Sequence, residues 1–187
     1  MTNTYSPTAI ATWANAVTVA RVLVSPLLFL LIDGGDGSWV ALVLWFVLCA
    51  SDGVDGWLAR RMGATRSGAF LDPLADKILV LGAMFMLVSY EVFPLVPVLL
   101  IAGREVAVSV YRTVVGARGV SVPAKRLAKA KTVTQQVAVA FALLPITARD
   151  ASWSWTVLLW AAVGLTLVTG WQYFAAARRS APAPPLQ

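Results

Sequence analysis

Four aspartates lie close together in a chain that is otherwise strongly apolar: Asp52, Asp55, Asp72 and Asp76. The first two are three residues apart and the last two are four apart, so each pair shares one helix face if its segment is helical. Two such helices facing each other would gather four carboxylates, which repel unless they are protonated or neutralised by a cation. Because hard divalent cations prefer carboxylate oxygens, the spacing indicates a site for one or two such ions.

Small residues continue the first aspartate pair along the same helix face. Asp52, Asp55, Gly56 and Ala59 stand at positions i, i+3, i+4 and i+7. Glycine lowers helix stability, so a glycine at position 56 indicates a packing or functional requirement there. Close packing of a neighbouring helix is one, and close approach of a flat or phosphorylated ligand is the other. The four aspartates favour the ligand, as does Gly68, and Arg60 ends the stripe where it can pair with an aspartate or hold a phosphate.

Composition indicates a membrane protein and limits the chemistry. The chain has 187 residues, of which 59% are apolar, and its mean hydropathy is +0.76. Soluble domains are about 45–50% apolar. There is no histidine, so a general base must be Asp, Glu, Lys or Tyr, and the single cysteine allows no disulfide within the chain. The net charge of +6 is spread between apolar segments, which favours anionic lipid headgroups over nucleic acid as its partner.

Six apolar segments, each near the roughly 20 residues that a span needs, predict six transmembrane helices. Their expected bounds are 12–32, 38–61, 70–90, 93–115, 131–147 and 153–177. We expect a short segment, 1–11, before a membrane domain at 12–179, and a disordered proline-rich tail at 180–187.

Lysine and arginine set the expected orientation. They concentrate in the second and fourth connections and after the sixth helix, whereas the other connections are mainly acidic. Positive loops stay in the cytoplasm, so both termini and the aspartate site should face the cytoplasmic side of the cell membrane.

The aspartate stretch resembles the signature of the CDP-alcohol phosphatidyltransferase family, D-x-x-D-G-x-x-A-R, a spacer, and G-x-x-x-D-x-x-x-D. The chain reads DGVDGWLAR, RMGATRS and GAFLDPLAD at these positions. The seven-residue spacer departs from the eight or nine residues expected of the family. The similarity covers roughly residues 13–147 and implies a six-span helical fold and a homodimer.

The resemblance also implies roles for single residues. The expected metal ligands, for two Mg²⁺ ions with Mn²⁺ as an alternative, are Asp52, Asp55, Asp72 and Asp76. Asp76 would in addition be the general base that activates the acceptor hydroxyl. The residues implied to contact the substrate CDP-diacylglycerol are Gly56, Ala59, Arg60, Gly68, Asn15 and Thr18. The acceptor oxygen would attack the lipid-side phosphorus, and CMP would leave.

Charged residues in and after the fourth helix bear on the acceptor. Arg104 and Arg112 are eight residues apart, about two turns, so both can face one side. With Lys125 and Lys131 they would line a basic site for an anionic acceptor such as a phosphorylated polyol. An internal ion pair involving Glu105, or a patch for lipid headgroups, explains the same charges.

Two looser motifs resemble the phosphatidylglycerophosphate synthase branch of the family. One is Asn15-x-x-Thr18-x-x-Arg21, and the other is the run Arg104-Glu105, Ser109, Arg112, Lys129-Ala-Lys131-Thr132 and Gln135. The branch implies sn-glycerol 3-phosphate as acceptor. Rival interpretations are a cardiolipin synthase with phosphatidylglycerol as acceptor, a membrane prenyltransferase, and a non-enzymatic cation transporter.

Overall fold

The computed structural model describes residues 12–33, 36–62, 65–117 and 126–179, and every regular element in these ranges is a helix. The helices are α1 (Trp13–Leu31), α2 (Trp39–Met62), α3 (Arg66–Ser89), α4 (Leu95–Ala117), α5 (Arg126–Leu143), α6 (Pro145–Asp150) and α7 (Ser152–Arg179). The expected all-α class is confirmed for these ranges. The segments 1–11 and 180–187 lie outside them, so the division of the chain into domains stays a prediction.

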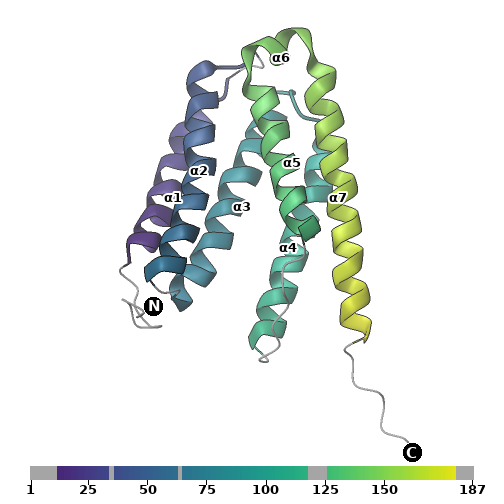
Figure 1. Cartoon of the computed structure of the whole chain (residues 1–187). Coiled ribbons are helices and arrows are strands. Elements are labelled where there is room, and N and C mark those ends of the chain that lie inside the picture. Colours follow the sequence, from purple (N-terminus) through teal and green to yellow (C-terminus); the bar gives the residue numbers. More distant parts are fainter. Residues whose placement is uncertain (1–11, 34–35, 63–64, 118–125, 180–187) are drawn as a thin grey trace, which may run out of the picture.

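The six long helices stand side by side, and successive ones run in opposite directions, with short α6 across one end (Figure 1). Helix α1 packs against α2 and α3, α7 packs against α5 and α4, and α5 also touches α2 and α3. The start of α1, the end of α2, the start of α3 and the end of α7 therefore lie at the same end of the bundle, which is the lower end in Figure 1. The aspartate motif lies on the end of α2 and the start of α3.

Three helical segments are long and apolar enough to cross a membrane: Trp13–Leu31, Trp39–Leu58 and Ser152–Gln172. The other three long helices, α3, α4 and α5, contain no apolar segment of that length with so few charged residues. Helix α3 contains Asp72, Asp76 and Lys77. The charged residues of α4 and α5 are Arg104, Glu105 and Arg112, and Arg126, Lys129 and Lys131. The expectation of six spans therefore stays a prediction for α3, α4 and α5.

Apolar side chains both fill the interior and cover the outside. Leu28, Trp45, Met84 and Leu159 are at most 1% exposed in one continuous core. Large apolar residues nonetheless face outward on several helices: Leu23, Leu30, Trp39, Phe46, Trp153 and Trp171. Such a surface is unusual for a soluble monomer and fits a lipid surrounding.

Helices α3 and α5 differ most from their expected bounds. Helix α3 begins at Arg66 instead of residue 70, because the Thr65 side chain accepts a hydrogen bond from the Gly68 backbone N–H and caps the helix. Helix α5 runs from Arg126 to Leu143 instead of 131–147. Pro145 starts the separate helix α6, where its ring and missing N–H are tolerated at a first turn.

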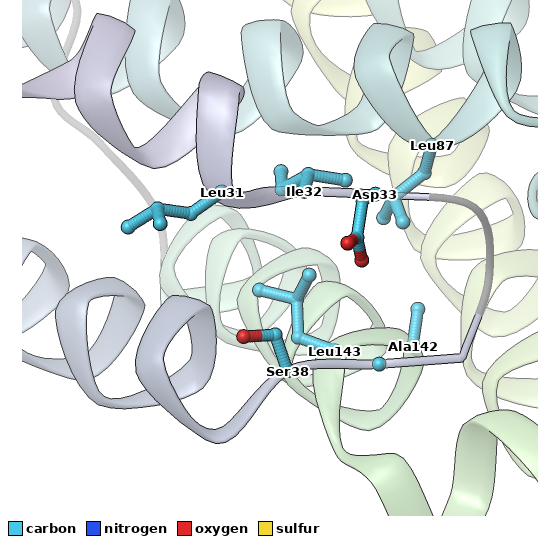
Figure 2. A pocket seen from close by; sticks show the side chains of 8 residues that line it. Leu31, Ile32, Asp33, Ser38, Leu87, Ala142 and Leu143 are labelled. Atoms are coloured by element: carbon cyan, nitrogen blue, oxygen red, sulfur yellow. The ribbon is translucent and has the colours of Figure 1, made fainter.

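At the end of the bundle away from the aspartates, the connection from α1 to α2 closes onto the end of α5 (Figure 2). Gly37 has a φ of +72°, and a Cβ there would lie 2.8 Å from the Leu143 carbonyl oxygen. The Ser38 N–H donates to that same carbonyl at 2.8 Å. The pocket beside this junction, about 10 Å³, is close to the size of one water molecule.

Candidate active site

Helix α1 carries a buried polar stripe in an otherwise apolar segment. Asn15, Thr18, Arg21 and Ser25 are all at most 5% exposed and recur every three or four residues, so they share one face. That face packs on α2 and α3, the helices with the aspartates. Polar groups in a membrane helix face the protein interior, and here they face the candidate site.

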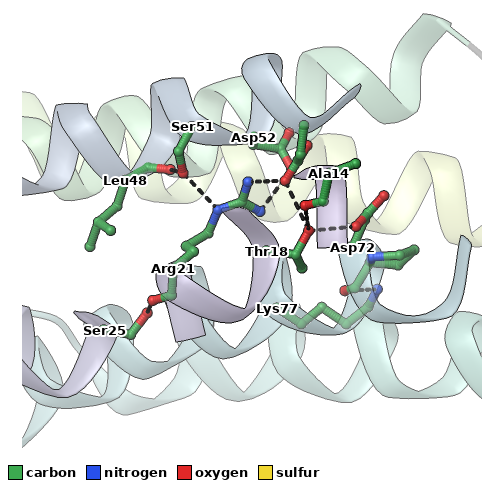
Figure 3. Close-up of polar contacts among 11 residues, drawn as sticks. Ala14, Thr18, Arg21, Ser25, Leu48, Ser51, Asp52, Asp72 and Lys77 are labelled. Carbon is green, nitrogen blue, oxygen red and sulfur yellow. Dashed lines mark hydrogen bonds and ion pairs between the residues drawn. The ribbon is translucent and has the colours of Figure 1, made fainter. Parts of the chain in front are cut away.

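Arg21 joins the first aspartate pair (Figure 3). Its Nη1 donates to Asp52 Oδ1 at 3.1 Å, its Nη2 pairs with Asp55 Oδ2, and its Nε donates to Ser51 Oγ at 2.9 Å. The side chain of Arg21 is 0% exposed and that of Asp55 2%, whereas Asp52 is 47% exposed. One aspartate of the pair is thus enclosed and the other opens outward.

Thr18 joins the two aspartate helices. Its hydroxyl lies 3.2 Å from Asp55 Oδ2 on α2 and 2.8 Å from Asp72 Oδ1 on α3. The Ala14 carbonyl oxygen is a third acceptor, at 3.1 Å. Through this one hydroxyl, carboxylates that are far apart in the sequence are held close together.

Asn15 and Gly68 set how closely α1 approaches the start of α3. The Asn15 Nδ2 donates to Ser67 Oγ at 2.8 Å. A Cβ on Gly68 would lie 2.9 Å from Asn15 Oδ1, closer than such atoms normally come. At Gly68, therefore, a helix-packing reason for glycine is present in the structure.

Asp76 lies one turn beyond Asp72 on α3 and is partly buried. The negative charge of Asp52 and the positive charges of Arg21 and Lys131 act on it. None of the described residues donates a hydrogen bond to its carboxylate. Asp76 therefore stands on the helix that carries Asp72, and that helix also packs against α5, which carries Lys131.

A second buried polar cluster joins α4, α5 and α7. Glu105 Oε1 accepts from Arg104 Nη1 at 3.1 Å and also pairs with Lys131 Nζ. Arg104 Nη2 donates to Thr169 Oγ1 on α7 at 2.9 Å. Glu105 is 9% exposed and Lys131 4%. The internal ion pair that the sequence left open for Glu105 is thus formed, and two of the four expected acceptor-site residues meet at it.

Several expected site residues are not described in full. The structure gives the helical backbone but not the side-chain surroundings of Ala59, Arg60 and Arg112, and Lys125 lies outside the described residues. Gly56 is partly buried on α2. Conversely, Arg21 was not among the expected site residues although it contacts two of them. The sequence feature that could have identified Arg21 is its charge inside an apolar helix, three residues after Thr18 and therefore on the same helix face.

The aspartate cluster fits a divalent cation in its donor chemistry. The Thr18 hydroxyl has one hydrogen for three acceptor oxygens, two of them from carboxylates. A nearby cation would relieve the repulsion among these oxygens, and carboxylates are suitable ligands. Among the described residues, no three Cys, Asp or Glu side chains already converge on one point as ligands do. The carboxylates that could bind an ion thus lie near one another, but those of the described residues are not arranged around a common point.

Comparison with known proteins identifies the family of the chain. The family model for CDP-alcohol phosphatidyltransferase matches residues 11–168. A CDP-diacylglycerol–glycerol-3-phosphate 3-phosphatidyltransferase of Bacillus subtilis is 36% identical over 177 residues, covering 86% of this chain and 92% of that protein. A probable phosphatidylglycerophosphate synthase of Mycobacterium tuberculosis is 39% identical over 176 residues, covering 91% and 83%. A Rickettsia typhi protein named like the first is 34% identical over 170 residues, covering 88% and 96%.

The match to the family model is longer than the motif alone indicated. It reaches residue 168 in α7, beyond the limit of about 147 expected from the sequence. Enzymes of this family act in membranes and depend in general on divalent metal ions. By its aspartate signature, its helical fold and these relatives, the chain belongs to the CDP-alcohol phosphatidyltransferase family.

Proposed function

We propose that this protein transfers the phosphatidyl group of CDP-diacylglycerol to sn-glycerol 3-phosphate, forming phosphatidylglycerophosphate and CMP in phospholipid synthesis. The names of the Bacillus subtilis and Rickettsia typhi relatives state this reaction. The observation that carries the proposal is the aspartate cluster: Asp52 and Asp55 on α2 and Asp72 on α3, drawn together by Arg21 and Thr18 of α1.

The metal ligands in this proposal are Asp52, Asp55, Asp72 and Asp76. They would hold two Mg²⁺ ions, for which Mn²⁺ can substitute. When bound, such ions neutralise the pyrophosphate of the CDP-lipid and act as Lewis acids on it. The chain contributes the fixed positions of its carboxylates, because α1 is bonded to both helices that carry them.

The nucleotide lies along the small residues that follow the aspartates. The proposed contacts with the CDP-lipid are Gly56, Ala59, Arg60, Gly68, Asn15 and Thr18. Gly68 and Asn15 are in close contact, so the nucleotide lies beside this contact at the start of α3 and not between the two residues. The Thr18 hydroxyl donates to carboxylates, so the methyl group is the part of the Thr18 side chain that remains for a contact with the substrate.

Asp76 acts as general base in the transfer. Its carboxylate accepts the proton of the acceptor hydroxyl, whose oxygen forms a bond to the lipid-side phosphorus. The bond from that phosphorus to the oxygen of the CMP phosphate breaks, and CMP leaves. The Asp76 carboxylate lies one turn from Asp72 and receives no hydrogen bond from the described residues, which supports this assignment, as does the absence of histidine from the chain.

The acceptor phosphate binds among Arg104, Arg112, Lys125 and Lys131. Arg104 and Lys131 both contact Glu105, so two of the proposed phosphate-binding cations are already held close together. Lys131 stands on α5, which packs against α3, the helix that carries Asp76, and this supports an acceptor site near the general base.

The site faces the cytoplasm in a cell membrane protein with six spans, both termini cytoplasmic, acting as a homodimer among membrane lipids. The start of α1, the end of α2, the start of α3 and the end of α7 share one end of the bundle, which supports this topology (Figure 1). The positive residues of the chain are also concentrated in connections at that end.

The test is CMP release by purified protein given CDP-diacylglycerol and Mg²⁺, with each acceptor added separately. Release with glycerol 3-phosphate, and not with phosphatidylglycerol, serine or inositol phosphate, is the expected result. Release only with phosphatidylglycerol would keep the chemistry and replace the acceptor. No release with any acceptor, by protein that binds Mn²⁺, would favour a cation carrier over a transferase.

A further inference from the structure

Three aspartates of the active site each have one carboxylate oxygen bonded to α1. Arg21 contacts Asp52 Oδ1 and Asp55 Oδ2, and Thr18 contacts Asp72 Oδ1 together with that same Asp55 oxygen. The second oxygen of each carboxylate receives no hydrogen bond from the residues that the structure describes. Each carboxylate thus has one oxygen that is bonded to α1 and one that none of the described residues contacts by a hydrogen bond.

Each of the three guanidinium nitrogens of Arg21 has a hydrogen-bond partner, which distinguishes a fixed positioning group from a temporary counter-ion. Its side chain is 0% exposed, and its Nε donates to Ser51, whose hydroxyl in turn donates to the Leu48 carbonyl oxygen at 2.7 Å. A guanidinium enclosed in this way cannot swing into solvent when a metal ion arrives. It can keep its two carboxylate contacts while the other oxygen of each carboxylate binds the ion.

Ligating carboxylates are usually hydrogen-bonded on their far side, and these outer partners orient them for the metal. We propose that Arg21 and Thr18 are positioning residues, which use one oxygen of Asp52, Asp55 and Asp72 to direct the other oxygen toward a divalent cation. The proposal rests on the proposed function, because it requires that these aspartates bind a metal ion. Two residues of the motif Asn15-x-x-Thr18-x-x-Arg21, Thr18 and Arg21, then orient the metal ligands, in addition to the substrate contact proposed for Thr18.

The experiment is a Mn²⁺ titration of the full chain in lipid nanodiscs, without substrate, followed by the electron paramagnetic resonance signal of free Mn²⁺. Loss of an outer partner weakens metal affinity by roughly 10- to 100-fold. We therefore expect such a loss in Arg21→Gln and in Thr18→Val. Arg21→Lys should recover part of the affinity, since one ammonium can reach one carboxylate, and Thr18→Ser should recover nearly all of it.

Matched controls separate positioning from general damage. Thr166→Val removes another buried threonine hydroxyl, on α7 beside Gln135, and Arg149→Gln removes an exposed arginine paired with Asp36. Both should bind Mn²⁺ like the unchanged protein. In CMP release, Thr18→Val should raise the Mg²⁺ concentration needed for half-maximal rate while kcat at saturating Mg²⁺ largely recovers, which a misfolded site would not show.

The outcomes are distinguishable. If the unchanged protein binds no Mn²⁺, the proposed metal role fails, and the positioning role fails with it. If the unchanged protein binds Mn²⁺ but Arg21→Gln and Thr18→Val bind it within about twofold or more tightly, only the positioning role is overturned. If Arg21→Gln does not fold, the comparison of Thr18→Val with Thr18→Ser decides.

Discussion

Arg21 and Asp55 form an ion pair that is closed off from the surroundings, with side chains 0% and 2% exposed. The same guanidinium reaches Asp52, whose side chain is 47% exposed. Removing one partner of a buried pair is strongly destabilising, because a charge is left without compensation. Asp55 therefore serves folding as well as the site, whereas Asp52 offers a test of the chemistry on an intact fold.

Asp52→Asn should lower the rate of CMP release by roughly 100-fold or more, because it weakens the binding of the divalent cation whose positive charge stabilises the transferring phosphate group. Its helix content and thermal midpoint should stay near those of the unchanged protein, since half of the Asp52 side chain is exposed. Circular dichroism and CMP release on the same preparation check both. Full activity in folded Asp52→Asn would contradict the metal site.

Gly68→Ala should weaken both stability and activity. The added Cβ would lie 2.9 Å from Asn15 Oδ1, and overpacking of this kind costs about 1–3 kcal/mol. Gly164→Ala is the matched control, because a Cβ there meets nothing within 4 Å and alanine favours a helix. Thermal unfolding of both variants is the measurement. Shortening the opposing side chain, in Gly68→Ala combined with Asn15→Ala, should recover stability if the clash is the cause.

Glu105→Gln should reduce the free energy of unfolding by about 3–5 kcal/mol, because the buried Lys131 would lose the negative charge with which it is paired. Asp36→Asn provides the contrast, since its pair with Arg149 is exposed and such pairs contribute about 0–1 kcal/mol. Denaturant unfolding in mixed micelles compares the two. Equal effects would show that the Glu105 cluster is not a structural link between α4 and α5.

Arg104→Gln should raise the KM for glycerol 3-phosphate by roughly tenfold, since a charge-assisted hydrogen bond is worth about 1.5–3 kcal/mol. The KM for CDP-diacylglycerol should stay the same, because Arg104 lies on α4 away from the aspartate pair of α2. Arg149→Gln, at the other end of the bundle, is the control. An unchanged KM for glycerol 3-phosphate would place the acceptor phosphate elsewhere.

Local spacing was sufficient to predict much of the site from the sequence. Aspartates three or four residues apart share a helix face whatever surrounds them, so the pairing of Asp52 with Asp55 and of Asp72 with Asp76 followed from helix periodicity. Long apolar runs indicated helices near the observed positions of α1, α2 and α7 for the same local reason. The end of α5 was missed, because Pro145 begins a new short helix in place of a simple turn.

Only the tertiary structure decided which side chains meet between helices. Arg21 contacts carboxylates 31 and 34 residues away, Thr18 contacts one 54 residues away, and Lys131 meets Glu105 across 26 residues. Such contacts depend on how the helices rotate and approach, which is set by packing details such as the missing Cβ of Gly68 against Asn15. The sequence by itself therefore determined the chemistry and the helices that carry it, while packing between helices determined that α1 holds the aspartates in place.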